Sequence, residues 1–483
     1  MQKTTRFGLC LLATLTACSD DGNLTGGGGN NTSGGNNTSG GGSTSGGPTQ
    51  PPGTEGQPPC STASTIEGEL ASSCYVGSDK TWLLKGLVTV KAGATITINK
   101  GTTIQGDNAS KAILLIEPGA KIVAEGTADE PIVFTSQASE GNKRPGDWGG
   151  VVIMGNAPVN FPGGKGNVEG ILKTVSGTSY GGSDPNDNSG VLKYVRIEYS
   201  GIILSQDNEV NGITFAGVGA GTTVDYVQVR QTLDDCFEFF GGTVNAKHLV
   251  CQRNQDDGFD FDNGYVGKLQ FLVLQQDPVH VGEDNGIESD NDAQGSANLP
   301  LTNPQVYNVT LCGKNADVDN AQFGLLVRKN SRGTFANMIV TGFESSLDIR
   351  DATGKALKAP LVGEPQLDIV SSLFFNAKGN GVIENVAYPE IGAAAPNKDN
   401  DEGFDEVAFV KQLDKKNKVS LDPAIDCYSP SNPVFGPASA IIDGAAVPPA
   451  DGFFDASAVY LGAFKDATDT WATTGKWVVW SEK

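Results

Sequence analysis

The sequence predicts an all-β fold, a right-handed parallel β-helix of roughly ten to twelve coils. An acidic hexapeptide occurs three times, as 234–239, 256–261 and 284–289, at offsets of 22 and 28 residues. Apolar triplets recur once per repeat, and short alternating β-runs are separated by Gly and Pro, whereas helical periodicity is nearly absent. Self-similarity at this period is typical of a solenoid, in which each repeat forms one coil stacked on the previous coil.

The N-terminus predicts export and a lipid anchor. Lys3 and Arg6 precede an apolar run, 9–15, that is too short to cross a bilayer and is typical of a signal peptide. The sequence Leu-Thr-Ala-Cys that ends at Cys18 resembles the cleavage site of bacterial lipoproteins. This resemblance implies that residues 1–17 are removed and that Cys18 receives diacylglycerol and an acyl chain such as palmitate. An ordinary secretory signal followed by a chance cysteine is the alternative.

Residues 18–59 are expected to form a disordered tether that begins with the lipidated Cys18. Ser19 rather than Asp follows the cysteine, so the retention pattern of the inner membrane is absent, and Ser19-Asp20-Asp21 resembles short acidic signals for surface export. From Gly22 onward the chain is almost wholly Gly, Asn, Ser, Thr and Pro, which cannot bury enough apolar surface to fold. We therefore expect an outer-membrane lipoprotein that is displayed on the surface of a bacterial cell.

The net charge argues against nucleic acid as a partner. The formal charge is −22, and removal of residues 1–17 leaves 32 basic against 56 acidic residues, a charge of −24. Such a balance also disfavours electrostatic attachment to anionic lipid headgroups, but it permits cation binding.

Six cysteines remain for the exported protein once Cys10 is removed and Cys18 is lipidated. An even number in an exported protein indicates disulfides. Cys60 and Cys74 are the favoured local pair, at the start of a β-helix domain expected to span 60–465. The spacing leaves the pairing of the other four open, and these are Cys236, Cys251, Cys312 and Cys427. No Cys-x-x-Cys occurs, which argues against a zinc or redox site.

The β-runs of the solenoid are expected to begin near Trp82. Six apolar triplets align one per coil, with their outer members pointing inward, at 195–197, 227–229, 249–251, 271–273, 309–311 and 338–340. A second column comprises Gly212, Cys236, Gly258, Gly286, Gly324 and Ser346. The gaps in this column predict insertions near 276–282 and 291–306, and residues 404–412 predict one short helix.

Residues 466–483 predict a C-terminal cap. This stretch contains Trp471, Trp477 and Trp480. A solenoid needs its open ends covered, because unpaired strand edges invite aggregation. We therefore expect these aromatic side chains to pack over an end of the solenoid rather than to bind a sugar.

Several motifs resemble the hallmarks of a large family of bacterial outer-membrane or surface lipoproteins. They are Asp-Trp-Gly-Gly at 147–150, Thr-Leu-Asp-Asp at 232–235, and the stretches 241–247, 256–261 and 267–271. The resemblance covers roughly residues 80–483. It implies a parallel β-helix of the pectin-lyase-like kind at the outer membrane, and it brings no assigned catalytic residues.

The acidic repeats predict a row of carboxylates on the outside of the stack. Phe237, Phe259 and Ile287 are expected to point inward, so the residues that follow them should point outward, about 4.8 Å apart. Carboxylates at this spacing repel one another unless they are protonated, paired or bridged by a cation, and Ca²⁺ suits such oxygen ligands. The metal or ligand candidates are Asp234, Asp235, Glu238, Asp256, Asp257, Asp260, Asp262, Asp284, Glu288, Asp290, Arg328 and Arg350.

Two simpler explanations compete with a cation or glycan site. The acidic residues can form a solvated face whose Asp and Gly merely make the turns. Arg328 and Arg350 can instead offset the acidic charges within the stack, where exposed pairs contribute about 0–1 kcal/mol.

The sequence favours a binding or structural role over catalysis. The pairs 234–235 and 256–257 resemble the acidic pairs of polygalacturonase-type glycosidases, but the Gly-His-Gly and Arg-Ile-Lys motifs of those enzymes are missing. The two histidines, His248 and His280, are expected to be structural or solvated. We therefore assign no catalytic residue and expect a lipid-anchored β-helix that binds Ca²⁺, a polysaccharide or another surface protein. A Ca²⁺-dependent polysaccharide lyase or glycoside hydrolase is one alternative, and an adhesin is another.

Overall fold

The computed structural model describes residues 54, 56–169, 171, 177–205, 208–280, 285–314, 322–350, 367–375, 406–419, 421–429 and 433–481. The chain divides into two compact units, residues 1–47 and residues 48–483, and every described residue lies in the second. Cys18 and most of the predicted tether lie outside the described residues. In the described part, no helix combines the length and the apolar character needed to cross a membrane.

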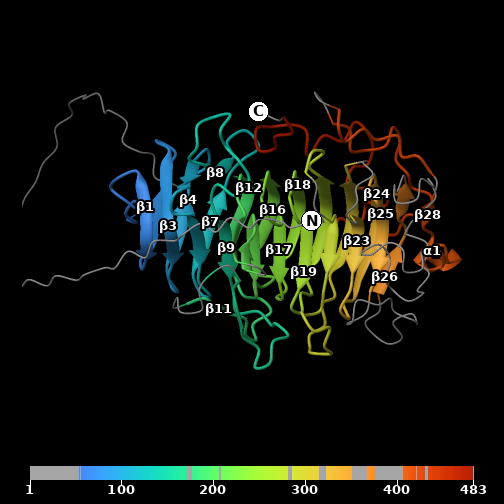
Figure 1. Cartoon of the computed structure of the whole chain (residues 1–483), viewed down its shortest axis with the longest axis horizontal. Coiled ribbons are helices and arrows are strands. Elements are labelled where there is room, and N and C mark those ends of the chain that lie inside the picture. Colours follow the sequence, from blue (N-terminus) through green and yellow to red (C-terminus); the bar gives the residue numbers. More distant parts are fainter. Residues whose placement is uncertain are drawn as a thin grey trace, which may run out of the picture. The chain divides into compact units, whose positions relative to one another are not determined.

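The strands of the second unit lie side by side in successive coils (Figure 1), and six of the long strands bend at a central residue with positive φ. Their first halves join one stack of parallel strands and their second halves join another. These strands are β12 (Gly190–Glu198), β16 (Thr223–Arg230), β18 (Asn245–Gln252), β20 (Lys268–Gln275), β22 (Gln305–Cys312) and β24 (Gly333–Thr341).

Further strands, most of them shorter, extend these two stacks and form a third. The first stack adds β2 (Cys74–Val76), β4 (Thr95–Ile98), β7 (Lys121–Glu125) and β26 (Leu367–Val370). The second adds β1 (Thr65–Leu70), β3 (Trp82–Val90), β5 (Thr103–Gly106), β8 (Ile132–Ser136), β27 (Leu373–Phe375) and β28 (Lys418–Val419). The third continues from the second halves of β1 and β3 through β6 (Ile113–Ile116), β9 (Gly150–Met154), β15 (Ile213–Ala216), β17 (Phe237–Phe240), β19 (Phe259–Asp262), β21 (Ile287–Ser289), β23 (Phe323–Val327) and β25 (Ser345–Ile349). Every pair in these stacks is parallel, which confirms the predicted all-β parallel solenoid.

The solenoid begins before Trp82, contrary to our expectation. β1 pairs with β3 and β2 pairs with β4, so both belong to the first coil. Gly68 has a φ of 73°, and the register of β1 shifts between Glu67 and Glu69. This irregularity breaks the alternation of apolar and polar residues by which a strand is recognised in sequence.

Two antiparallel hairpins and one short helix depart from the coils. β10 (Gly166–Asn167) pairs with β11 (Ser179–Tyr180), and β13 (Ile202–Ser205) pairs with β14 (Asn208–Val210). The predicted insertions follow β20 and β21. The predicted helix is α1 (Glu406–Val410), whose Val410 is fully buried in the solenoid core, and the 3₁₀ turn η1 (Leu413–Lys415) follows it.

Side chains of one type stack in the core. Phe237 pairs with Phe259, and Phe259 pairs with Ile287, and all three are buried as predicted. The rings of Phe237 and Phe259 are stacked with their centroids 5.3 Å apart.

The column that contains Gly258 is also in register, and a Cβ added there would lie 2.7 Å from the carbonyl oxygen of Gly286. Close approach of successive coils therefore requires small residues in this column.

The triplets pair as predicted, with one correction in β20. Leu249 pairs with Leu272, so the inward triplet of β20 is 272–274 and not 271–273. Phe271 instead occupies the bend of the strand, where φ is 65°. The equivalent bend residues of neighbouring strands, Tyr226 and His248, also have positive φ. The three rings form one stack with His248 in the middle. The centroids of Tyr226 and His248 are 4.1 Å apart, and those of His248 and Phe271 are 4.9 Å apart.

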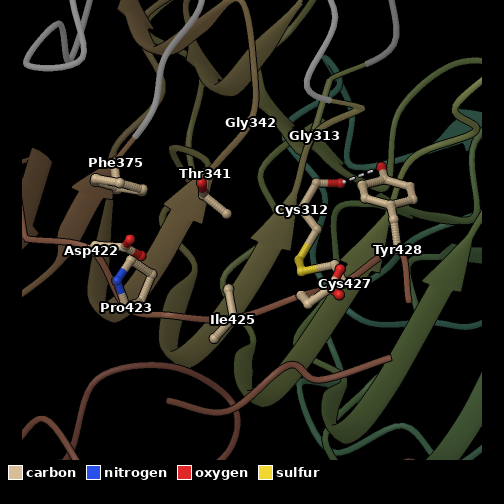
Figure 2. Close-up of a pocket in the computed structure, with 11 residues that line it drawn as sticks. Cys312, Gly313, Thr341, Gly342, Phe375, Asp422, Pro423, Ile425, Cys427 and Tyr428 are labelled. Atoms are coloured by element: carbon tan, nitrogen blue, oxygen red, sulfur yellow. Dashed lines mark hydrogen bonds between the residues drawn. A yellow bond between two sulfur atoms is a disulfide. The ribbon is translucent and has the colours of Figure 1, made fainter. Parts of the chain in front are cut away.

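The six cysteines that lie after Cys18 in the sequence form three disulfides. The predicted pair Cys60–Cys74 is present, and the pairing that the sequence left open is Cys236–Cys251 and Cys312–Cys427. The third disulfide spans 115 residues and attaches the C-terminal part of the chain to β22 (Figure 2). Beside it, Tyr428 donates a hydrogen bond to the carbonyl oxygen of Cys312 at 3.2 Å.

The segment 433–481, which we call the lateral segment, lies along the side of the solenoid, where we had expected residues 466–483 to cap an end. Asn337 of β24 exchanges two hydrogen bonds with the backbone of Ala446, at 2.9 and 2.8 Å. Gln228 of β16 exchanges two with the backbone of Val479, both 2.9 Å long. The segment therefore runs back across successive coils. The correction has a physical cause, because side-chain amides on the long strands provide hydrogen-bond partners that an irregular chain can use.

Candidate metal centre

The turns that precede β17, β19 and β21 are connected by side chains. Asp235 Oδ1 accepts a hydrogen bond from the backbone N–H of Asp257 at 2.7 Å. Asp257 Oδ1 accepts one from the N–H of Asn285 at 2.8 Å, and Asn285 Oδ1 accepts one from the N–H of Phe323 at 3.0 Å. Each side chain therefore satisfies a backbone donor of the next coil, which holds the turns at a fixed spacing.

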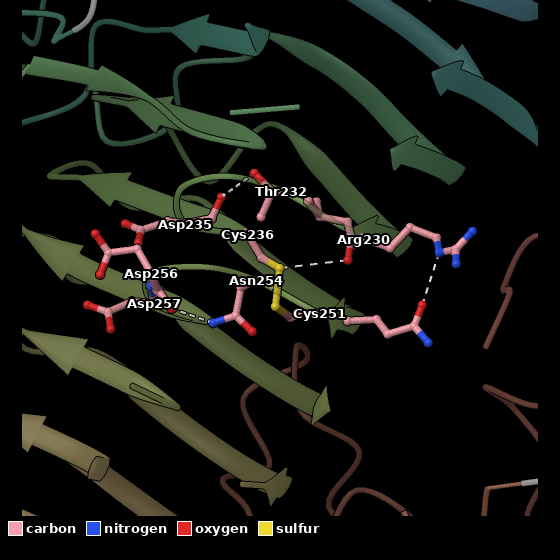
Figure 3. Close-up of a disulfide and its surroundings, with 10 residues drawn as sticks. Arg230, Thr232, Asp235, Cys236, Cys251, Asn254, Asp256 and Asp257 are labelled. Atoms are coloured by element: carbon pink, nitrogen blue, oxygen red, sulfur yellow. Dashed lines mark hydrogen bonds between the residues drawn. A yellow bond between two sulfur atoms is a disulfide. The ribbon is translucent and has the colours of Figure 1, made fainter. Parts of the chain in front are cut away.

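The paired aspartates gather beside the second disulfide (Figure 3). Figure 3 shows Asp235, Asp256 and Asp257 on one side of Cys236–Cys251, with Arg230 on the other. Asp234, Asp235 and Asp257 are buried, with exposed fractions of 5%, 6% and 4%, whereas Asp256 is exposed.

The outward row on the strands is present but is not solvated. Glu238, Asp260 and Glu288 pair in register on β17, β19 and β21, and they alternate with the buried apolar column. Glu238 is only 4% exposed, and Asp260 and Glu288 are partly buried. A solvated acidic face is therefore the wrong explanation for these three carboxylates.

The described carboxylates form three groups, and within each group the oxygen atoms lie within 4.8 Å of one another. The first group is Asp234, Asp235 and Asp256, the middle group is Asp235, Glu238 and Asp260, and the last group is Asp257, Asp260 and Glu288. Neighbouring groups share Asp235 or Asp260. We call these seven residues the acidic row, since they are continuous across three coils.

Several oxygen atoms of the acidic row are buried and have no hydrogen-bond partner among the described residues. They are Asp234 Oδ2, Glu238 Oε1 and Asp260 Oδ1. The other oxygen of Glu238 accepts a hydrogen bond of 3.4 Å from Asn211 Nδ2. A buried carboxylate oxygen in this state is costly unless a proton or a cation satisfies it.

Burial raises the pKa values of six of the seven carboxyl groups in the acidic row. It raises the pKa of Asp234 to about 7, and the charges of Glu209 and Glu169 add to the rise. Burial, followed by the charge of Asp260, holds the pKa of Glu238 well above its usual range. Burial is also the main cause of the raised pKa values of Asp235, Asp257, Asp260 and Glu288. Ionisation of these carboxyl groups is therefore unfavourable unless a cation takes the place of the proton.

A second outward column lies two residues further along the strands. It contains Asp262, Asp290, Arg328 and Arg350. Arg328 donates from Nε to Asp290 Oδ1 at 2.9 Å and from Nη2 to Asp290 Oδ2 at 3.1 Å, and it also forms an ion pair with Glu288. Arg350 donates to Asp348 at 2.9 Å. Burial, followed by the charge of Asp290, raises the pKa of Asp262 to about 8.

A family model described as a pectate-lyase-like β-helix domain matches residues 68–400. The chain belongs to this family. No curated protein and no solved structure matches the chain. Membership of the pectate-lyase-like β-helix family agrees with the parallel stacks and confirms the predicted fold.

Sequence reasoning missed several polar residues around the acidic row of this pectate-lyase-like β-helix. Glu169 and Glu209 add negative charge near Asp234, and both belong to the insertions that carry the two hairpins. No repeat marks such insertions, so the sequence held no signal for them. Asn285, in contrast, aligns with Asp235 and Asp257 in the repeat, and this alignment could have revealed it. The candidate Asp284 lies outside the described residues.

Two other features of this pectate-lyase-like β-helix lie apart from the acidic row. A pocket of about 320 Å³ adjoins Cys312–Cys427, and its walls include Thr341, Phe375 and Tyr428 but no residue of the acidic row (Figure 2). The histidines make structural contacts. His248 Nδ1 lies 2.7 Å from Asp225 Oδ1, and the carbonyl oxygen of His280 accepts a hydrogen bond of 2.8 Å from Lys314.

Proposed function

We propose that the acidic row binds a divalent cation, Ca²⁺, and that the protein is a lipid-anchored binding protein of the bacterial outer membrane. The observation that carries the cation is the middle group. Its residues, Asp235, Glu238 and Asp260, offer oxygen atoms within 4.8 Å of one another. Glu238 and Asp260 each have a buried oxygen without a partner. A cation would satisfy these oxygens and remove the repulsion between the carboxylates.

The chemistry of the donor atoms favours Ca²⁺ over softer metals. All seven residues of the acidic row offer carboxylate oxygen, and none offers sulfur or imidazole nitrogen. Hard oxygen ligands suit Ca²⁺, which accepts about 6–8 of them in flexible geometry. The exposed Asp256 at one end of the row, together with the partly buried Asp260 and Glu288, gives an ion access from solvent.

The proposed partner outside the cell is an acidic polysaccharide, bound through the cation. The description of the family as pectate-lyase-like supports a polysaccharide-related role. A net negative protein cannot attract an acidic polymer by its own charge, so a bound cation would supply the contact. Lipidation at Cys18 and the long tether would hold the β-helix at the membrane, and both rest on the sequence pattern.

Thermal unfolding with and without Ca²⁺ tests the proposal. We expect Ca²⁺ to raise the Tm of the chelator-treated protein, because an ion that binds the folded state alone stabilises it. The double variant Glu238→Gln and Asp260→Asn, which disrupts the middle group, should show a clearly smaller rise. Glu67→Gln, which removes an exposed carboxylate of β1, is the control and should retain it. An unchanged Tm of the wild type in millimolar Ca²⁺ would exclude the cation.

A polysaccharide lyase or glycoside hydrolase is the second candidate, and one observation favours it. The pKa of Asp234 is raised to about 7 beside Asp235, which is the range of a general acid in glycoside hydrolysis. Arg328 is less suited to act as a lyase base, since it is paired with Glu288 and Asp290. Release of products from a panel of acidic polysaccharides, and its loss in Asp234→Asn, would favour the enzyme over the binding protein.

A further inference from the structure

The acidic row ends at a charge that the chain itself supplies. The guanidinium group of Arg328 forms ion pairs with Glu288, in the last group of carboxylates, and with Asp290, at 2.9 Å from its Oδ1. The side chains are well enclosed, with exposed fractions of 26% for Arg328, 12% for Glu288 and 7% for Asp290. Little water therefore screens these pairs, and Arg328 is held in place by two partners.

The middle of the row has no such charge among the described residues. Among the described residues, no lysine or arginine forms an ion pair with Asp234, Asp235, Glu238 or Asp260. Asp234 and Glu238 are at least nine-tenths buried, and each has one oxygen without a partner. Among the described residues, Arg328 therefore relieves the carboxylate repulsion in the last group, and no basic side chain pairs with the three carboxylates of the middle group.

We infer that Arg328 is an internal replacement for a bound cation. It occupies the last group of carboxylates and prevents Ca²⁺ from binding there, so that the protein takes up cations at the first and middle groups alone. This inference rests on the proposed function. It adds that the number of bound Ca²⁺ ions is limited, and that Arg328 sets this limit.

The first test counts the ions that each protein binds. Equilibrium dialysis against Ca²⁺, followed by elemental analysis, should show that Arg328→Gln binds one ion more than the wild type. Arg328→Lys keeps the charge and should bind the same number as the wild type. Arg350→Gln is the matched control, because it breaks an arginine–aspartate pair on the next coil, outside the acidic row, and should gain no ion.

Thermal unfolding gives the same variants a second readout. In chelator, both Arg328→Gln and Arg350→Gln should melt below the wild type, because each removes an ion pair with a largely buried carboxylate. Ca²⁺ should restore the Tm of Arg328→Gln toward that of the wild type in Ca²⁺, and it should not restore Arg350→Gln to the same extent.

Two variants that keep Arg328 allow the test to be made even if Arg328→Gln misfolds. Glu288 belongs to the last group alone and Glu238 to the middle group alone. Glu288→Gln should bind as many ions as the wild type, and Glu238→Gln should bind fewer.

Loss of an ion in Glu288→Gln, or no gain in Arg328→Gln when the wild type binds Ca²⁺, overturns the inference and leaves the proposed function standing. If the wild type binds no Ca²⁺ while Arg328→Gln binds one ion, the proposed function fails and the role of Arg328 holds. Absence of binding in both overturns both.

Discussion

Individual carboxylates of the acidic row differ in their tasks, although they look alike in the sequence. Asp235 and Asp257 each direct one oxygen at a backbone N–H of the next coil. Glu238 and Asp260 have buried oxygens that bind nothing within the described residues. The first pair therefore supports the fold, and the second pair is available to a ligand. A mutation meant to remove the ligand while preserving the coils should target Glu238 and Asp260.

Substitution of Asp257 should separate its structural role from its charge. Asp257→Ala leaves the buried N–H of Asn285 without an acceptor, which should lower the free energy of unfolding by about 1–3 kcal/mol. Asp257→Asn keeps an oxygen acceptor and should cost less. Chemical denaturation of the two variants, in chelator, measures the difference. Equal losses would show that the charge of Asp257, and not its hydrogen bond, matters for stability.

The raised pKa values predict how stability depends on pH. The pKa of Asp234 is about 7 and that of Asp262 about 8 in the folded protein, against 3.8 as the usual value. Between pH 4 and these values the unfolded chain has lost protons that the folded protein keeps, so rising pH favours unfolding. We expect the Tm of the chelator-treated protein to fall as the pH rises from about 4 to about 8.

Calcium should reverse this trend, because the ion replaces the protons. The rise in Tm on adding Ca²⁺ should therefore be larger at pH 8 than at pH 5. Asp234→Asn cannot titrate, and its Tm in chelator should depend less steeply on pH than that of the wild type. An identical slope in Asp234→Asn would assign the pH dependence to other groups.

Strands and their register were predictable from the sequence to the extent that the repeat is regular. The column of Phe237, Phe259 and Ile287 follows from alternation alone, and it is found where the repeat placed it. The triplet of β20 was misplaced by one residue because Phe271 is apolar yet occupies the bend, which alternation cannot distinguish from a strand position. The burial of Glu238 was not predictable at all, because the acidic repeat marks only the direction of the side chain and not what covers it.

The lateral segment should detach when its side-chain contacts are removed. Gln228→Ala breaks both hydrogen bonds to Val479. In the intact protein the backbone N–H of Lys476 donates to the carbonyl of Ala128 at 2.7 Å, so trypsin can cut after Lys476 only once the segment opens. We expect Gln228→Ala to be cut several-fold faster there, as measured by mass spectrometry. Gln105→Ala, on β5, is the control, and an equal rate in both variants would argue against the predicted role of Gln228.

For the whole molecule, the sequence makes a prediction about location that the described residues do not test. Cys18→Ser should abolish labelling by palmitate and release the protein from membranes, because the acyl chains would be its anchor. Fractionation of cells that express the wild type and the variant measures this. Protease treatment of intact cells addresses display, and complete protection of the wild type would exclude an outward-facing β-helix.

The lateral segment also imposes an order on maturation. Its hydrogen bond from Arg196 to Lys476 joins residues that are 280 positions apart, whereas neighbouring coils contact one another within a few tens of residues. During synthesis and export the coils can stack from the N-terminus as each one emerges, but the side of the stack stays open until the last residues arrive. Closure of the lateral segment, fixed by Cys312–Cys427, is therefore the final step, and a chain that lacks its C-terminus should fold with its coils formed and its side exposed.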